Sequence, residues 1–539
     1  MTHGKRLAAV WLVVGLLVSA LPAAADIVYE TGYFEVTEQD GRWWLIDPDG
    51  ERFYSLGVNL VNPHAYNAPD LGYAPYYENI LDIYGSESAW ADELVNRFEA
   101  WGFNTMGSWS DVGLLGDRLP YTYNLGLSGH DWQSGTIPDY WGQAFLDRVA
   151  SIVTSTVVPR ADDSMLVGWF FDNEMRWGVD IRGIRDLVYD YFTFAADAPG
   201  KIALVDFLRS KYGNDVQAFN AAWGFDVASF DDLLDITEVS PVAENQAQYD
   251  DRYEFTALAA KQYFKTCHDA VRAADPNHLL LGSRFISWLT PRVVLDEIVP
   301  YTDVISINHY IPWDLFMPML EPIFDWLDIP DTGNQLAEFH EQTGKPLMVS
   351  EFSIRGEDAG LPNSWPPKYF FKVVATQAER GQFYSDFAYA SFRSGYMVGH
   401  HWFAWMDEPP EGRFDGEDSN FGIVDNWDDP WMPLVTRMQA ANADALVWPL
   451  PDDDDDAVDD DDMIDDDDAV DDDDTVDDDD LTDDDDVVDD DDVADDDDIV
   501  DDDDMTDDDD TDDDAVDDDD DASAVSGNAD DDDDDGCGC

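Results

Sequence analysis

The chain has 539 residues, of which 44% are hydrophobic, and its many aromatic side chains can fill a large core. Its formal net charge of −93 excludes nucleic acid and anionic membranes as partners, because affinity for phosphate groups requires Lys and Arg. Only three cysteines are present, so a disulfide framework is excluded as the basis of the fold.

The N-terminus has the pattern of an export signal. Lys5 and Arg6 precede an apolar run from Leu7 to Ala20, and an Ala-x-Ala site ends at Ala25. The alternative is a membrane anchor, but the run is shorter than the ~20 residues that a transmembrane helix requires. We therefore predict a signal peptide at 1–25 and a mature chain without a transmembrane segment. The protein is then secreted, or extracytoplasmic and associated with the cell surface.

Residues 26–450 are predicted to form one α/β catalytic domain. A small N-terminal β-hairpin is expected at 33–52, with its turn at Asp47–Gly50. After it, short β-rich runs alternate with amphipathic helical stretches, which is typical of parallel strands with crossover helices. Strands are expected at 53–61, 103–110, 121–127, 165–174, 278–285, 304–310, 346–353 and 399–407. Helices are expected at 90–100, 141–158, 255–274, 334–343 and 368–394.

Eight such β/α units favour a (β/α)8 TIM barrel. The alternative is an open doubly wound sheet, but no Gly-x-Gly-x-x-Gly motif follows a strand, so nucleotide binding has no support. The long interval between the fourth and fifth strands holds two further helices, at 202–212 and 215–223. We predict that this helical insertion lies over the top face of the barrel.

The last segment, 451–539, contains 55 Asp and no Glu, Lys or Arg, in near-repeats such as AVDDDD and TVDDDD. Such a sequence cannot build a packed core, so we predict a disordered low-complexity tail that acts as a solvated spacer. The alternative is weak calcium binding, because hard cations take carboxylate oxygens. The tail ends in Gly-Cys-Gly-Cys, and attachment to the cell surface is one interpretation of that ending.

Two glutamates follow predicted strands at the end where barrel enzymes carry their active sites. Glu174 ends the fourth strand and Glu351 lies near the end of the seventh. Two carboxylates in one bowl can cleave a glycosidic bond by double displacement, because one protonates the leaving oxygen while the other attacks the anomeric carbon. The alternative is that each glutamate only pairs with Lys or Arg on a loop.

Several stretches carry a more specific resemblance. GFNTMGSWSD, GWFFDNEMRWG, VSEFS and GHHWFAWMDEPPEGRFDGEDSNFGIVD resemble the clan A retaining glycoside hydrolases, and most closely the β-agarase family, glycoside hydrolase family 50. The likeness covers most of 40–445, and it implies that Glu174 is the general acid/base and Glu351 the nucleophile. After Glu351 the chain reads SIRGEDAGLPN and departs from the His-Phe-Gly type sequence of the agarases.

Polar side chains near the strand ends are predicted to bind the sugar. Asn173 can hydrogen-bond the 2-hydroxyl, and Tyr310 can donate to Glu351. His309 is expected either to bind a sugar hydroxyl or to be structural. Arg355 is a candidate for a sulfate or uronate group, with solvation as the alternative. The remaining polar candidates are Asn59, Asn104, Arg284 and Glu408.

Aromatic side chains are predicted to stack on pyranose rings. The candidates are Trp109, Trp177, Trp402 and Trp405, and strand alternation is expected to place some of them in the core. His400 and His401 face opposite sides of one strand and cannot chelate a single ion, so we expect no metal and no cofactor. Cys267 follows a helical pattern and is predicted to be a small buried hydrophobe.

The predicted function is therefore that of a retaining β-glycosidase that hydrolyses a galactose-containing, agarose-like polysaccharide or oligosaccharide. The alternatives within enzymes are a β-galactosidase or a β-mannanase of the same clan. From a different class, the alternative is a non-catalytic polysaccharide-binding surface protein. The presence of both carboxylates favours the enzyme.

Overall fold

The structure of the protein is a computed structural model that describes residues 31–180, 182–183, 185–239, 245–310, 335–366 and 371–445. The predicted signal peptide at 1–25 and the Asp-rich segment at 451–539 lie outside the described residues.

Cys267 is buried and forms no disulfide with any described residue, as its apolar helical neighbours predict. Within the described part of the chain, no helix has both the length and the apolar character needed to cross a bilayer.

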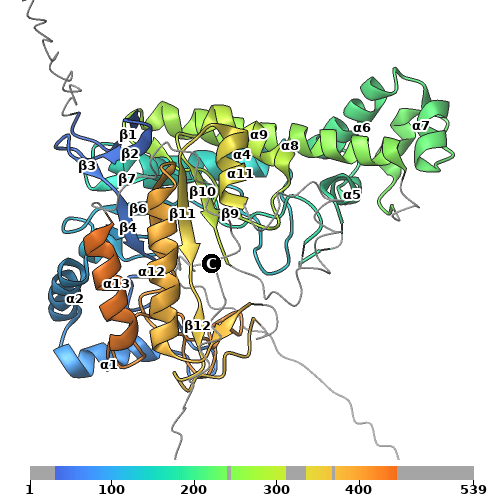
Figure 1. Cartoon of the computed structure of the whole chain (residues 1–539). Helices are drawn as coiled ribbons and strands as arrows, with labels where there is room; N and C mark the ends of the chain where they lie inside the picture. The colour runs from blue at the N-terminus through green and yellow to red at the C-terminus, as the bar shows by residue number, and fades with distance from the viewer. Residues whose placement is uncertain are drawn as a thin grey trace, which may run out of the picture. The chain divides into compact units, whose positions relative to one another are not determined.

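A parallel sheet forms the centre of the molecule (Figure 1). Its strand order is β8-β7-β6-β5-β4-β14-β11-β10-β9. The strands are β4 (Ser55–Val58), β5 (Thr105–Met106), β6 (Tyr121–Asn124), β7 (Leu166–Phe170), β8 (Leu279–Leu280), β9 (Phe285–Ile286), β10 (Ile305–Asn308), β11 (Leu347–Phe352) and β14 (Met397–Trp402). They are shorter than the predicted strands, and each predicted strand contains or overlaps at least one of them.

The two edges of this sheet belong to one stretch of chain. β8 pairs with β7 and β9 pairs with β10, yet both lie within residues 279–286. The sheet therefore curls round until its edges meet on the fifth predicted strand. The other strands follow one another round the ring in chain order, whereas a doubly wound sheet reverses its order at a switch point. The fold is TIM-like, and the open sheet is not observed.

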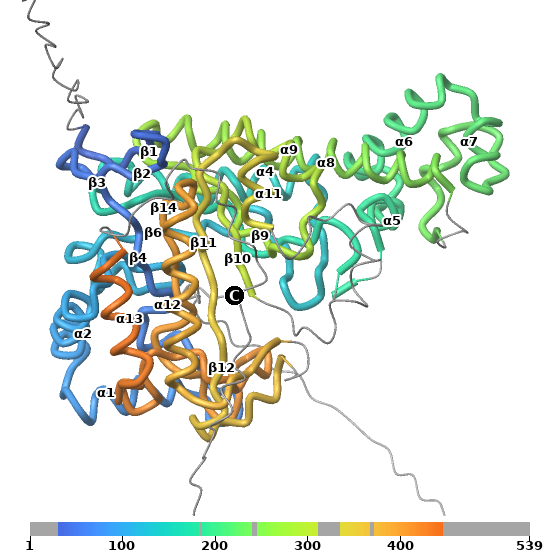
Figure 2. Tube along the Cα trace, in the orientation of Figure 1, coloured from blue at the N-terminus to red at the C-terminus, as the bar shows by residue number. Residues whose placement is uncertain are grey.

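Helices pack around this ring (Figure 2). They are α1 (Pro75–Tyr84), α2 (Glu87–Trp101), α3 (Val112–Leu115), α4 (Gln143–Ile152), α8 (Gln246–Ala274), α9 (Arg292–Ile298), α11 (Gln335–Thr343), α12 (Gln377–Arg393) and α13 (Met432–Asp444). α4 continues through a π-helical turn (Val153–Val157) and a 3-10 turn (Val158–Arg160). α12 begins at Gln377, not at the predicted 368, because Thr376 and Glu379 form a capping box there.

The helical insertion lies beside the ring and not over its mouth. It contains α5 (Leu187–Thr193), α6 (Pro199–Lys211), α7 (Val216–Trp223) and a 3-10 turn (Phe230–Asp235), and all three α-helices contact α8. Tyr212 and Trp223 both donate to Asp251 near the start of α8, at 2.7 and 2.6 Å. Because α8 extends well past the ring in Figure 1, helices anchored to its first turns lie to one side. The predicted position over the top face was wrong.

A small antiparallel sheet precedes the ring. β1 (Glu35–Gln39) pairs with β2 (Arg42–Ile46), which pairs with β3 (Arg52–Phe53). Asp47 accepts hydrogen bonds from the backbone of Asp49 and Glu51, which forms the turn between β2 and β3. A second turn lies at Asp40–Gly41, so this region has three strands and not the two of a simple hairpin. A further two-stranded sheet joins β12 (Arg355–Gly356) to β13 (Val373–Val374).

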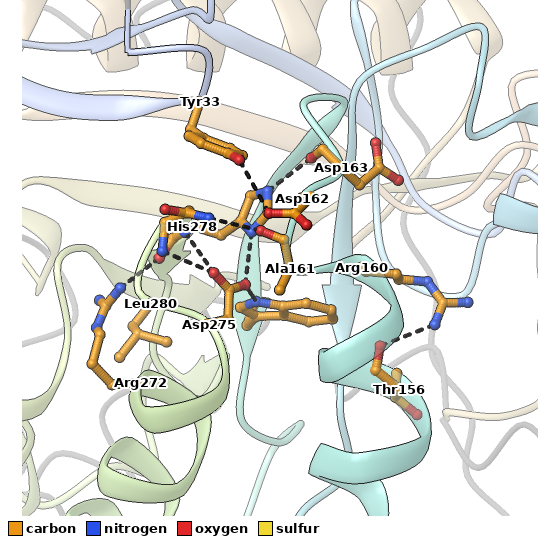
Figure 3. Close-up of polar contacts among 12 residues, drawn as sticks. Tyr33, Thr156, Arg160, Ala161, Asp162, Asp163, Arg272, Asp275, His278 and Leu280 are labelled. Atoms are coloured by element: carbon orange, nitrogen blue, oxygen red, sulfur yellow. Dashed lines mark hydrogen bonds and ion pairs between the residues drawn. The ribbon is translucent and has the colours of Figure 1, made fainter.

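A buried polar cluster closes the ring at the N-terminal ends of β7 and β8 (Figure 3). His278 Nδ1 lies 2.7 Å from a carboxylate oxygen of Asp275, and Nε2 lies 2.7 Å from the carbonyl oxygen of Asp163. The indole of Trp169 donates to the same carboxylate oxygen of Asp275 at 2.7 Å. Both nitrogens of this buried histidine thus have partners, so the cluster stabilises the end of the ring opposite to the one considered next.

Candidate active site

A cavity of about 770 Å³ lies at the C-terminal ends of the strands. Residues at the C-terminal ends of four strands of the ring line it, namely Glu174, Ile286, Tyr310 and Glu351. Its walls are rich in aromatic side chains: Trp109, Trp132, Trp288, Trp365, Phe371, Phe383, Phe403 and Phe421. A concave site of this size, with apolar walls and few polar groups, suits an organic ligand with stackable faces, such as a short run of sugars.

Glu174 follows β7 and is held by two donors. Trp132 Nε1 lies 2.7 Å from Oε2, and Asn308 Nδ2 lies 3.0 Å from Oε1. Arg182 does not reach the carboxylate and instead donates to the carbonyl oxygen of Glu174 at 2.7 Å. Both donors to the carboxyl group are uncharged. At least one of these hydrogen bonds therefore remains whether Glu174 is protonated or ionised. This surrounding suits a group that gives up and regains a proton.

Glu351 lies within β11 and is held by a cation. Arg284 Nη2 lies 2.7 Å from Oε1, and the hydroxyl of Tyr310 donates to Oε2 at 2.8 Å. Burial raises the pKa of Glu351 to about 7, Arg284 and Tyr310 oppose that rise, and the nearby charge of Glu174 adds to it. When Glu174 is protonated, its contribution to the rise disappears. The carboxylate form of Glu351 is therefore favoured when Glu174 carries a proton.

Arg284 connects the ends of three strands. Its guanidinium contacts Asn173 at 2.9 Å, Asn59 at 3.3 Å and the carbonyl oxygen of Ser350 at 3.2 Å, in addition to Glu351. Asn173 Oδ1 also accepts a hydrogen bond from Asn308 at 3.1 Å. The oxygen of the Asn173 amide is thus occupied within the protein. The NH2 group of Asn173 is the part of this amide that is left to bind a ligand.

Four residues at this end of the ring have left-handed backbone conformations without being glycine. The φ angles of Leu60, Trp109, Glu174 and Arg284 are 59°, 61°, 49° and 45°. Such conformations are costly for residues with a Cβ atom and are retained where the surrounding structure enforces them. They lie at the end of the ring that carries the cavity, and two of them, Trp109 and Glu174, line it.

The structure brings together seven of the predicted site residues. Those that line the cavity are Glu174, Glu351, Asn173, Tyr310 and Trp109. Arg284 and Asn59 lie directly behind them, in the network described above. Arg284 also packs its guanidinium 4.2 Å from the ring centroid of Trp109. Arg355, a candidate for an acidic substituent, lines the cavity as well.

Other predicted binding residues lie elsewhere. His309 contacts Ser287 at 3.2 Å and stacks on Phe387 of α12, and burial lowers its pKa to about 4. Asn104 bridges backbone groups of Leu56 and Tyr54. These side chains face the helices or join strands and do not line the cavity, so His309 has the structural place that was its alternative, and Asn104 lies away from the position predicted for it.

Three predicted tryptophans and one glutamate also belong to the interior. Trp402 is buried against Phe352 of β11 and Tyr384 of α12. Trp177 is buried among aromatic side chains that include Tyr263 of α8. Glu408 accepts a hydrogen bond from the backbone of Ser419 and does not line the cavity. Trp405, whose indole donates to Tyr76, is likewise in the core.

The sequence analysis did not identify two donors to Glu174. Asn308 is adjacent to His309, which was chosen in its place, and strand alternation turns these two neighbouring side chains to opposite faces, with Asn308 toward Glu174 and His309 toward α12. Trp132 lies in a loop without a repeating pattern, so only its aromatic character could have indicated a role. His400 and His401 are buried, and no group of three or more potential ligands for a metal occurs among the described residues.

Comparisons with known proteins give relatives of this chain in sequence and in fold. No family model matches the chain. The chain is 30% identical to β-agarase A of Vibrio sp. (strain JT0107) over 487 aligned residues, which cover 78% of this chain and 46% of the relative. β-Agarase B of the same strain is 26% identical, with coverage of 77% and 48%. The chain thus spans about half the length of the curated relatives that it matches.

Solved structures give the same result. The crystal structure of an agarase, AgWH50C, has a TM-score of 0.63 at 26% identity, with 77% of this chain and 65% of that chain covered. An exo-β-agarase shares the fold at a TM-score of 0.65 and 24% identity, with coverage of 78% and 66%. The resemblance that the motifs predict is confirmed: this chain is β-agarase-like in sequence, and its fold is similar to that of solved agarase structures.

Proposed function

We propose that the protein is a retaining β-glycosidase that hydrolyses agarose-type polysaccharide, with Glu174 as acid/base and Glu351 as nucleophile. One observation carries the proposal. Two carboxyl groups line a single cavity, and their partners differ, because Glu351 is held by a cation and Glu174 by uncharged donors. A cation next to a carboxylate favours its ionised form, which a nucleophile requires.

In the first step, an oxygen of Glu351 attacks the anomeric carbon while Glu174 donates its proton to the departing glycosidic oxygen. The bond to the leaving sugar breaks and a covalent glycosyl ester forms on Glu351. In the second step, Glu174 removes a proton from a water molecule, which attacks the same carbon and releases Glu351. The NH2 group of Asn173 is placed to bind the sugar 2-hydroxyl, since its amide oxygen is held by Arg284 and Asn308.

The substrate class follows from the relatives, whose names give them as agarases. The aromatic walls of the cavity support a carbohydrate ligand, since pyranose rings present apolar faces. We further propose that the enzyme acts outside the cytoplasm, on the basis of the export pattern at 1–25. Residues 26–450 then carry the activity.

The test is turnover of agarose and of an aryl β-galactoside by the wild-type protein and two variants. Glu174→Gln and Glu351→Gln are each expected to reduce kcat by at least about three orders of magnitude, because each removes one half of the reaction. Azide is expected to restore part of the activity of Glu351→Ala with inversion of the product. Wild-type rates in either Gln variant would refute the assignment, and inverted product from the wild-type enzyme would refute retention.

A further inference from the structure

The cavity holds polar donors that the proposed reaction does not use. Ser353 and Arg355 follow Glu351 by two and four residues, and both line the cavity. The hydroxyl oxygen of Ser353 and the Nε of Arg355 are buried and have no hydrogen-bond partner within the described residues. Unpaired buried donors are rare in proteins, because each costs desolvation energy, and those in a ligand cavity point to an acceptor on the ligand.

The hydrogen-bond partners of Arg355 are all uncharged and do not neutralise its positive charge. Its Nη1 donates to the carbonyl oxygen of Pro366 at 2.6 Å and lies 3.2 Å from Ser419 Oγ, and its Nη2 lies 3.3 Å from the carbonyl oxygen of Phe371. None of these partners carries a charge. Arg355 is only 1% exposed, so water does not solvate the guanidinium fully.

The nearest carboxylates bind other partners. Glu408, Glu417 and Asp418 affect Arg355 through their charge, without an ion pair. Glu408 and Glu417 are both engaged by Arg413, whereas Asp418 accepts hydrogen bonds from the backbone and hydroxyl of Ser364. Arg355 therefore keeps a positive charge next to the cavity.

Lys372 is a second cation that lines the same cavity. Four cationic side chains line it, and two of them, Arg182 and Arg413, form ion pairs with carboxylates. Lys372 is exposed and forms no ion pair with any described residue. It follows Phe371, whose carbonyl oxygen binds Arg355. Two cations without ion pairs, together with an unpaired hydroxyl, form a set that a neutral sugar hydroxyl would not require.

We propose that Ser353, Arg355 and Lys372 form a subsite for an acidic substituent on the galactan, either a sulfate ester or a carboxylate. Arg355 offers its Nε and the remaining N–H of Nη2 to two oxygens of such a group, because Pro366, Ser419 and Phe371 occupy its other donors. The hydroxyl of Ser353 donates to the same group, and Lys372 adds a second charge. The inference rests on the proposed function and narrows its substrate class to acidic galactans.

The test compares three agarose-type oligosaccharides of equal length. One is neutral, one carries 6-O-sulfate on galactose, and one is oxidised at C6 to galacturonate. The wild-type enzyme is expected to have a kcat/KM about tenfold higher for one of the acidic substrates than for the neutral one, since a charge-assisted hydrogen bond contributes about this factor. The sulfated and oxidised substrates distinguish the two sources of charge.

Single substitutions test which residues cause the preference for the acidic substrate. Lys372→Met and Arg355→Met are expected to lower the ratio of acidic to neutral kcat/KM about tenfold, and Arg355→Lys is expected to retain part of it. Lys261→Met, which removes an exposed lysine of α8 paired with Glu297, is the matched control and keeps the ratio. Equal or better turnover of the neutral substrate by the wild type would overturn the inference, as would an unaltered ratio in Lys372→Met.

Binding separates this inference from the proposed function. Calorimetry on the Glu174→Gln variant measures Kd for the three oligosaccharides without turnover. About tenfold tighter binding of an acidic oligosaccharide supports the subsite even if no substrate is hydrolysed by the wild type, in which case only the proposed function fails. Tighter binding of the neutral oligosaccharide would overturn the subsite and leave the glycosidase assignment standing.

Discussion

Replacement of Tyr310 by Phe tests the protonation scheme of the two glutamates. The hydroxyl of Tyr310 donates to Oε2 of Glu351 at 2.8 Å, while Arg284 holds Oε1. The ring of Tyr310 lies among Phe371, Phe403 and Phe421, which offer no donor in its place. A hydrogen bond to a charged group contributes about 1.5–3 kcal/mol, so its loss raises the pKa of Glu351 by about one to two pH units.

The measurement is kcat/KM as a function of pH, whose acid limb reports the group that must be ionised in the free enzyme. Because Glu351 attacks as the carboxylate, a higher pKa moves the acid limb of Tyr310→Phe to higher pH. At a pH below both limbs, kcat/KM is expected to fall about 10- to 100-fold relative to wild type.

Tyr121→Phe is the matched control. Its hydroxyl donates to Asp163 at 2.7 Å, at the opposite end of the ring, so the variant removes a similar bond without touching Glu351. Its acid limb is expected to coincide with that of the wild type. If Tyr310→Phe also keeps the wild-type limb, Tyr310 does not support the charge of Glu351 and the reasoning fails.

Three further predictions concern stability, positioning and the tail. The folded-state pKa of Glu351 is raised from 4.5 to about 7, so its contribution to stability is complete below pH 4.5 and is lost as the pH rises through 7. The free energy of unfolding of Glu351→Gln minus that of the wild type should therefore increase by about 3 kcal/mol from pH 4 to pH 8. A difference that does not change with pH would contradict this prediction. Asn308→Ala removes donors to Glu174 and Asn173 and should lower kcat about 10- to 100-fold with a smaller change in KM, whereas an effect confined to KM would argue against positioning. Deletion of 451–539 should leave kcat/KM on soluble oligosaccharide within about twofold, as a spacer requires, and a large loss would show that the tail acts in catalysis.

The positions of the strands could be predicted from the sequence, because each is a short apolar run bounded by turns and polar residues. Glu174 and Glu351 could be placed for the same reason, since residues at or just beyond the C-terminal end of a strand lie at one end of the ring. The resemblance to the agarases added their roles. None of this required knowledge of where a particular side chain points.

Side-chain direction could not be predicted in the same way. Neighbouring residues of a strand face opposite sides, so an error of one residue exchanges the interior for the exterior. The sixth strand is an example, because Asn308 and Tyr310 face the site while His309 between them faces α12. Trp402 packs on α12 for a similar reason. Contacts such as Trp132 with Glu174 depend on a loop whose path follows no local pattern.

The position of Arg284 explains how the ring and the site depend on each other. The fifth strand is interrupted between β8 and β9, and Arg284, with its left-handed backbone, lies in that interruption. A regular strand would have placed consecutive side chains on alternate faces, whereas the interruption lets the guanidinium reach groups at the C-terminal ends of three other strands of the ring. One of those groups is Glu351 and another is Asn173, so the stretch on which the edges of the sheet meet also fixes the proposed nucleophile against its neighbours. The unpaired Nε of Arg284 shows that this buried position is costly, and its contacts with both residues give the reason for retaining it.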